Sequence, residues 1–66
     1  MNYDEIRQLI RIRHELRRLM PGRDCNAAQR LLARMRSLIS RDSRERAKVE
    51  PEIERWQVAF SLTATP

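Results

Sequence analysis

The chain has 66 residues, a net charge of +5 and a single cysteine. A chain this short forms one domain and buries only about 60% of its unfolded surface, so its own core supplies about 3–5 kcal/mol of stability. One cysteine excludes an internal disulfide, and one cysteine with one histidine cannot complete a structural zinc site. We therefore expect a single domain over residues 1–60 that is stabilised by association, with no metal and no cofactor.

The start of the chain, from Met1 to Glu5, is acidic and lacks the charged-then-apolar pattern of a secretion signal. No apolar run approaches the ~20 residues that a membrane-spanning helix needs. An unpaired cysteine fits a reducing compartment. These features predict a cytoplasmic protein with no membrane segment.

Arginine dominates the charge of this chain. Fourteen basic residues stand against nine acidic ones, and all of the basic residues except Lys48 are arginine. This balance describes a mixed surface that favours an anionic partner without being a polycation. The arginines are explained either by bidentate recognition of phosphate or carboxylate or by a GC-rich genome whose codons favour arginine.

A first helix is predicted over residues 3–20. Asn2 and Glu5 have the spacing of a capping box, and Pro21 with Gly22 ends the helix. Arg13 and Arg17 fall inside its apolar arc. Either the aliphatic parts of their side chains pack along the contact between two helices, or their guanidinium groups pair with carboxylates of a partner. This arc covers roughly 200°, too much for one neighbouring helix. It is centred on Ile6, Leu9, Ile10, Leu16 and Met20, and it is widened by Tyr3, Ile12 and Leu19.

A second helix is predicted over residues 26–40, after a loop with turn chemistry at 21–25. Either Asp24, or Asn26 with Gln29, is expected to cap it. Leu31 and Leu38 are expected at the centre of its apolar face. The short loop predicts an antiparallel hairpin with the first helix. The full apolar face is Ala27, Ala28, Leu31, Leu32, Met35, Leu38 and Ile39.

The segment 41–46 is interpreted as a linker or a solvated extension, because Asp42 and Arg46 would enter the apolar face of a longer second helix. Pro51 suits the first turn of a short third helix over 50–60. Val49, Ile53, Trp56 and Phe60 line one side of this helix, either closing the open end of the hairpin or exposing an aromatic anchor for a partner. Residues 61–66 are expected to form a disordered tail.

These elements predict an all-α fold, since no segment alternates with period two. Two hairpins meeting through the wide face of the first helix would form a homodimeric helical bundle. The alternative is a monomeric three-helix bundle, in which the third helix covers the rest of that face.

Catalytic chemistry is nearly absent from the sequence. Gly22 is the only glycine, so no glycine-rich phosphate loop exists. Cys25 near a helix start and His14 on the polar side of another helix do not form a nucleophile with its base. We therefore expect a protein that is not an enzyme.

Two functional hypotheses remain. The first is a regulatory, inhibitory or adaptor protein that binds another protein through helical surfaces, as small helical adaptors and inhibitors do. Its expected contact residues are Ile12, Arg13, Arg17, Leu19, Trp56 and Phe60. The second is binding of duplex DNA or RNA through phosphate contacts, although no recognition helix and no aromatics interleaved with arginines are present. Its expected contact residues are Arg7, Arg11, Arg18, Arg30, Arg34 and Arg41.

Overall fold

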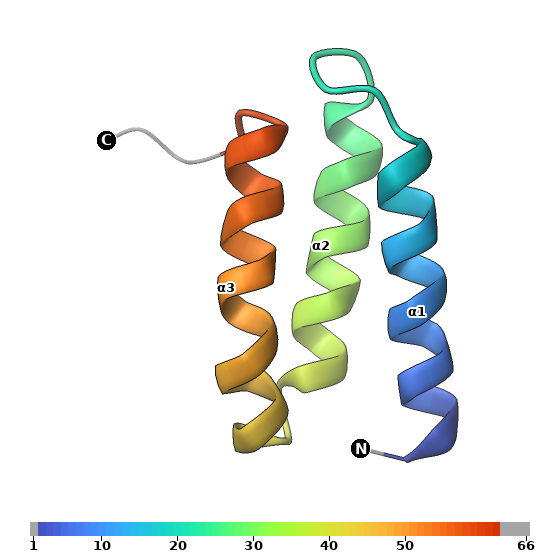
Figure 1. Ribbon diagram of the computed structural model, residues 1–66, viewed down its shortest axis with the longest axis vertical. Coiled ribbons are helices and arrows are strands. Elements are labelled where there is room, and N and C mark those ends of the chain that lie inside the picture. The colour runs from blue at the N-terminus through green and yellow to red at the C-terminus, as the bar shows by residue number, and fades with distance from the viewer. Residues whose placement is uncertain (1, 63–66) are drawn as a thin grey trace.

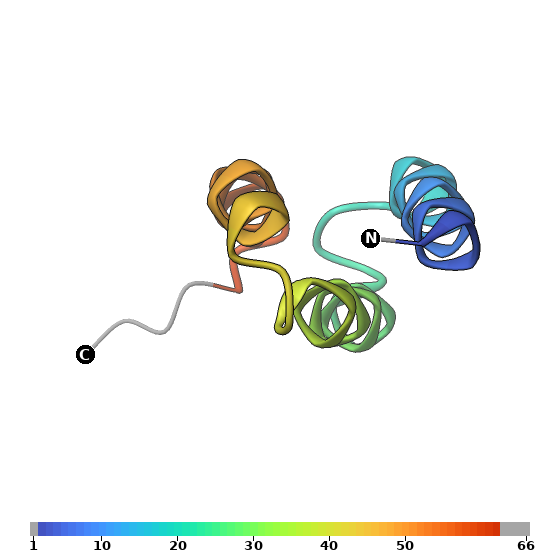
Figure 2. The same cartoon turned by 90° about the horizontal axis from the view of Figure 1, so that it is seen from below.

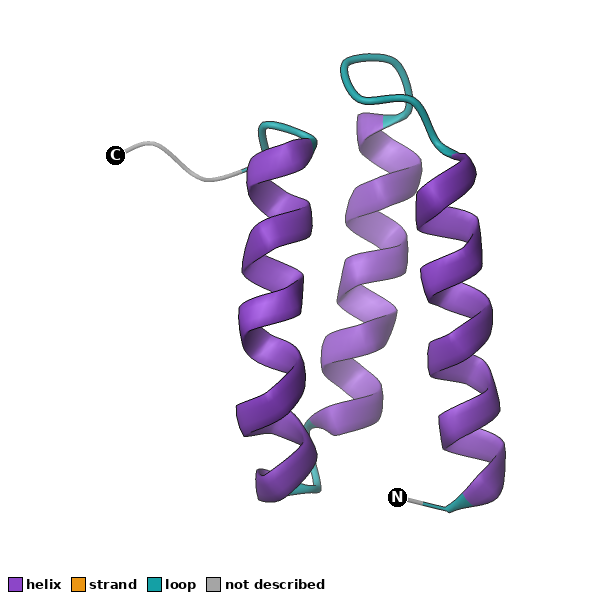
Figure 3. Ribbon diagram, viewed as in Figure 1, coloured by secondary structure: helices purple, strands orange, loops and turns teal. Residues whose placement is uncertain are grey.

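The computed structural model describes residues 2–62 as three α-helices, with no β-strand among these residues. The helices are α1 (Tyr3–Arg18), α2 (Cys25–Ile39) and α3 (Ser43–Ala59), and Figure 3 shows that short loops join them. The prediction of an all-α fold is confirmed for this part of the chain. Each described helix is too short or too polar to cross a lipid bilayer.

The capping box at the start of α1 is present as predicted. The backbone N–H of Glu5 donates to Asn2 Oδ1 at 2.9 Å, and the backbone N–H of Asn2 donates to Glu5 Oε1 at 3.2 Å. Two otherwise unpaired donors of the first turn are thereby satisfied. The helix ends at Arg18, two residues before the predicted end, because Leu19 adopts an extended conformation.

The loop between α1 and α2 is held by Asp24. Its Oδ2 accepts a hydrogen bond from the backbone N–H of Met20 at 2.9 Å, and Gly22 has a φ of +84°. This left-handed conformation favours glycine because it has no Cβ. Asp24 occupies the N-cap position of α2, but its side chain closes the loop instead of capping the helix.

The prediction of a linker over 41–46 is wrong, because α3 begins at Ser43. Asp42 is its N-cap, and Asp42 Oδ1 accepts hydrogen bonds from the backbone N–H groups of Arg44 and Glu45, both at 3.1 Å. Asp42 is indeed incompatible with a longer second helix. The same side chain is well suited to cap the start of a new helix, and the sequence analysis did not assign this role to Asp42.

Pro51 lies in the interior of α3 and not in its first turn as predicted. It has no N–H to donate to the carbonyl group of Ala47, four residues earlier. Both Ala47 and Pro51 are exposed, so water has access to that carbonyl group. Burial of Val49 and Ile53 on the opposite side holds the helix continuous through this position.

The end of α3 is a Schellman motif. The backbone N–H of Leu62 donates to the carbonyl of Gln57 at 2.7 Å, that of Ser61 donates to Val58 at 3.1 Å, and Ser61 has a φ of +56°. This turn brings Leu62 onto the core, where it is partly buried. The predicted tail over 61–66 otherwise lies outside the described residues.

The three helices form a flattened body measuring 33 × 27 × 14 Å, with α2 between the two outer helices. Figure 1 shows α1 and α3 running in the same direction and α2 in the opposite one. Figure 2, seen along the helices, shows both outer helices on one side of α2 and apart from each other. Each outer helix packs against α2, and the two outer helices approach each other less closely.

The core is built around α2. Met35 at 0% exposed and Leu32 at 3% lie at its centre, whereas Leu31 and Leu38, the predicted centre, are partly buried at its margin. The apolar face of α2 is therefore rotated from its expected position, because it serves α1 on one side and α3 on the other. The buried residues are Leu9, Ile12, Leu16, Ala28, Leu32, Met35, Ile39, Val49, Ile53 and Phe60.

The apolar arc of α1 is only partly covered. Leu9, Ile12 and Leu16 are buried, but Ile6 and Ile10 are 44% and 46% exposed. The buried part of this face is thus displaced from the predicted centre toward Ile12, which was predicted to lie at the edge. The displacement follows from the position of α2, which covers one half of the arc and leaves the other half open.

The core position of Met35 generates a stability prediction. Met35→Ala should lower the free energy of unfolding by about 2–5 kcal/mol, because it leaves a cavity at a fully buried position. That loss is comparable with the whole stability expected of so short a domain. Urea unfolding followed by circular dichroism measures it. Leu31→Ala, at the core margin, should cost clearly less, and an equal cost for both variants would contradict this assignment.

Candidate functional site

A groove with a volume of about 630 Å³ lies between α1 and α3. It exists because both outer helices pack against α2 and not against each other. We call it the α1/α3 groove. It is lined by Arg13, Arg17, Lys48, Glu52, Arg55, Trp56 and Ala59.

An ion pair between Arg13 and Glu52 links the two helices across this groove. Arg13 Nε donates to Glu52 Oε2 at 2.8 Å and to Oε1 at 3.1 Å, and Arg13 Nη2 donates to Oε1 at 2.9 Å. Such a two-nitrogen arrangement is geometrically specific as well as charge-assisted. Both side chains are partly exposed, at 36% and 26%, so the pair contributes little stability and mainly fixes the spacing of α1 and α3.

The groove lowers the pKa of Glu52. Partial burial acts to raise the pKa of this carboxyl group, but the hydrogen bonds and charge of Arg13, the indole of Trp56 and the charge of Arg55 together outweigh burial. The pKa therefore lies below its usual range. Glu52 is ionised at neutral pH, as its pairing with Arg13 requires.

Trp56 forms an aromatic part of the groove. Its Nε1 donates to Glu52 Oε2 at 3.4 Å, and its ring lies 6.2 Å from the ring of Phe60, tilted by 33°. Phe60 is 1% exposed, so it supports Trp56 from inside the core. Trp56 itself is partly exposed and presents a fixed apolar surface to the groove.

The electrostatics of the groove favour an anion. It carries four cations and one carboxylate, a net charge of +3. Glu52 is engaged by Arg13, and within residues 2–62 no carboxylate lies within ion-pair distance of Arg17, Lys48 or Arg55. These three cations are available to a ligand.

The residues expected to bind a protein partner divide into two groups. Arg13, Arg17 and Trp56 come together in the α1/α3 groove. Leu19 is partly buried in a separate, shallow groove between α1 and α2. Ile12 and Phe60 are 4% and 1% exposed, so they act inside the core and do not reach a partner.

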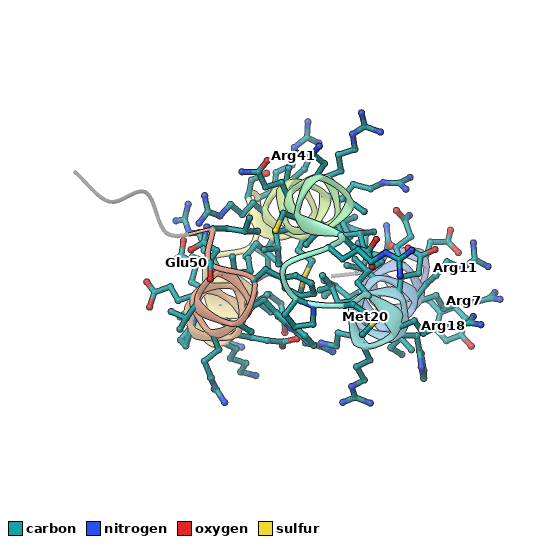
Figure 4. All side chains as sticks on the ribbon, turned by 90° about the horizontal axis from the view of Figure 1, so that it is seen from above. Arg7, Arg11, Arg18, Met20, Arg41 and Glu50 are labelled. Carbon is teal, nitrogen blue, oxygen red and sulfur yellow. The ribbon has the colours of Figure 1, made fainter. Side chains whose placement is uncertain are left out.

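The structure brings the arginines expected to contact phosphates together only in part. Figure 4 shows Arg7, Arg11 and Arg18 projecting from the side of α1 that faces away from α3, whereas Arg41 lies beside α2 on another side of the molecule. Arg18 and Arg30 both line the groove between α1 and α2. Arg34 is exposed on α2.

Sequence reasoning found Trp56 but missed the other α3 residues of the groove. Lys48, Glu52, Arg55 and Ala59 recur at intervals of four, three and four residues, which places them on one side of a helix. This signal was present in the sequence, but it becomes visible only when the helix extends before residue 50.

Neither candidate for covalent chemistry lies in the groove. The thiol of Cys25 is partly buried and donates to the carbonyl oxygen of Phe60 at 3.5 Å, so it helps join α2 to the end of α3. His14 is exposed on α1. Among residues 2–62, no group of three His, Cys, Asp or Glu side chains is placed to hold a metal ion.

Comparison with models of known protein families, with characterised proteins and with solved structures finds no match for this chain.

The ion pair generates a pH prediction. The lowered pKa of Glu52 means that its contribution to stability is present above the usual glutamate pKa, about 4.3, and is lost as the pH falls through the lower pKa of the folded state. The free energy of unfolding of the native chain should therefore approach that of Glu52→Gln between about pH 5 and pH 3. Urea unfolding over this range measures the difference.

Glu54→Gln is the matched control, because Glu54 is exposed on the same helix outside this groove. Its difference from the native chain should stay nearly constant over the same pH range. A constant difference for Glu52→Gln as well would contradict the ion pair.

Proposed function

We propose that this chain is a non-enzymatic binding protein that recognises another protein through the α1/α3 groove. The observation that carries the proposal is the composition of that groove. It combines a supported tryptophan with three cations, none of which has a carboxylate within ion-pair distance among residues 2–62, although the charge of Arg55 acts on Glu52. Tryptophan and arginine are the residues that most often dominate the energetics of protein interfaces.

The absence of a closed reaction site among the described residues supports a binding role. No polar or charged residue within residues 2–62 is buried, so every titratable side chain in that range is in contact with solvent. Catalytic groups usually gain their reactivity from burial and from specific neighbours that shift their pKa values. The described titratable side chains instead lie on exposed surfaces, where they can contact a binding partner.

Nucleic-acid binding is the alternative function. It would use Arg7, Arg11 and Arg18 on α1 together with the arginines of α2. Arg41 lies on another side of the molecule from Arg7, Arg11 and Arg18, and this separation favours protein recognition, because a duplex presents its phosphates to one face of a small protein. Assembly of two copies also stays a prediction. The wide apolar face of α1 that is expected to carry it contains Ile12, which packs within a single chain.

Matched charge reversals test the proposal. Arg17→Glu with Lys48→Glu changes the groove, and Arg34→Glu with Arg41→Glu changes the outer side of α2 by the same total charge. Each tagged variant is incubated with nuclease-treated lysate of the native host, and captured proteins are identified by mass spectrometry. A partner held by the native chain and by the α2 variant should be lost by the groove variant.

The same variants test the alternative. Binding to random duplex DNA and RNA is measured at two salt concentrations, since each neutralised phosphate adds about −0.9 to the slope of log K against log salt on duplex DNA. A steep slope that is reduced only in the α2 variant would contradict the proposal. Capture of the same proteins by all three chains would contradict it as well.

A further inference from the structure

The large apolar side chains that remain exposed gather on α1. Within residues 2–62 they are Tyr3 at 73%, Ile6 at 44%, Ile10 at 46%, Met20 at 59% and Val58 at 67% exposed. All but Val58 belong to one series, in which intervals of three and four residues alternate. We call the members of this series that lie on the helix, Tyr3, Ile6, Ile10, Arg13 and Arg17, the open seam of α1, and Met20 follows in the loop after the helix.

The open seam has the spacing of a helix–helix contact. Alternating intervals of three and four residues place side chains along one line that faces a partner helix. The buried side of α1 has the same spacing in Leu9, Ile12, Leu16 and Leu19, and it packs against the rest of the domain. Helix α1 therefore carries two such lines, and within the chain the open seam is used at Arg13, through its ion pair with Glu52, while Ile6 and Ile10 remain exposed.

The open seam borders the α1/α3 groove. Ile6 and Ile10 stand seven residues, or about two turns, before Arg13 and Arg17, so each pair lies on the same side of α1. Arg13 and Arg17 line the groove directly. The apolar first half of the seam and the cationic groove thus form one continuous strip along α1.

We infer that this strip is the docking site for an acidic amphipathic helix of the partner protein, lying along α1 and completing a four-helix arrangement. The inference rests on the proposed function and specifies the chemistry of the partner. Apolar residues of the incoming helix would pack on Ile6, Ile10 and Trp56. Its carboxylates would pair with Arg17, Lys48 and Arg55, which have no carboxylate within ion-pair distance among residues 2–62.

The length of the strip sets the size of the helix. Fourteen residue steps separate Tyr3 from Arg17, which corresponds to about 21 Å or about four helical turns. A helix of this length is marginal alone in water. Its folding would therefore accompany docking, as is common when amphipathic helices bind grooves.

A second copy of the chain is a less suitable occupant. Each groove has a net charge of +3 and each chain a net charge of +5. Placing two such grooves face to face would oppose like charges within a Debye length, about 10 Å at 0.1 M salt. An acidic helix supplies the complementary charge that a second copy lacks.

The test uses a synthetic 18-residue peptide that contains no tryptophan. Leucines stand at alternating intervals of three and four residues, and glutamates flank them. A control peptide has the same composition in an order that destroys this spacing. Binding is followed by the fluorescence of Trp56, the only tryptophan in the chain, and by isothermal titration calorimetry. We expect the patterned peptide to shift the Trp56 emission to shorter wavelength and to bind at least about tenfold more tightly than its control.

Variants locate the binding site. Ile6→Gln with Ile10→Gln should weaken the patterned peptide at least about tenfold, and both positions are exposed enough to keep the domain folded. Val58→Gln is the control for replacing an exposed apolar side chain, because Val58 is 67% exposed and does not line the groove. Raising the salt from about 0.05 to 0.5 M should weaken binding several-fold.

Three results would overturn the inference. The first is equal binding of the patterned and control peptides, or no binding of either. The second is equal weakening by Val58→Gln. The third is a solution mass of two chains that Ile6→Gln with Ile10→Gln reduces to one, which would assign the strip to a second copy. If any one of these results occurs while the groove variant, Arg17→Glu with Lys48→Glu, still loses its lysate partner, the proposed function stands and only the acidic helix is wrong.

Discussion

A single apolar face on α2 has to serve two helices, and the rest of the structure follows from this constraint. Met35 and Leu32 lie at the centre of that face and are almost completely buried between α1 and α3. A helix is only about 10 Å wide. Two helices that pack side by side on the same face of α2 therefore stand apart on the side that α2 does not cover. The outer helices therefore leave a groove between them and an uncovered half of the apolar arc on α1.

The ion pair between Arg13 and Glu52 spans the gap that this arrangement creates. A dry apolar contact at that place would close the groove, whereas a partly exposed, hydrogen-bonded pair fixes its width and keeps it accessible. Trp56 is held by the carboxylate of Glu52 on one side and by Phe60 on the other. Most of the groove is thus preorganised before any partner arrives, which reduces the cost of binding.

Much of the fold follows from the sequence, and the errors have identifiable causes. The capping box of Asn2 and Glu5 located the start of α1 correctly, because both side chains satisfy local backbone donors. The start of α3 was missed because Pro51 was taken as a beginning, although Asp42 is the stronger signal. The extent of the groove depends on Lys48 and Arg55, which enter it only through the placement of α3. No local pattern specifies which half of the arc on α1 the neighbouring helices will cover.

The most direct test of the central claim is a map of backbone amide chemical shifts in the native chain before and after addition of its captured protein partner. We expect the largest changes along α1 from Ile6 to Arg17 and on the facing side of α3 around Arg55 and Trp56, with the outer side of α2 near Arg34 unchanged. Changes centred on α2, with the groove unaffected, would contradict it.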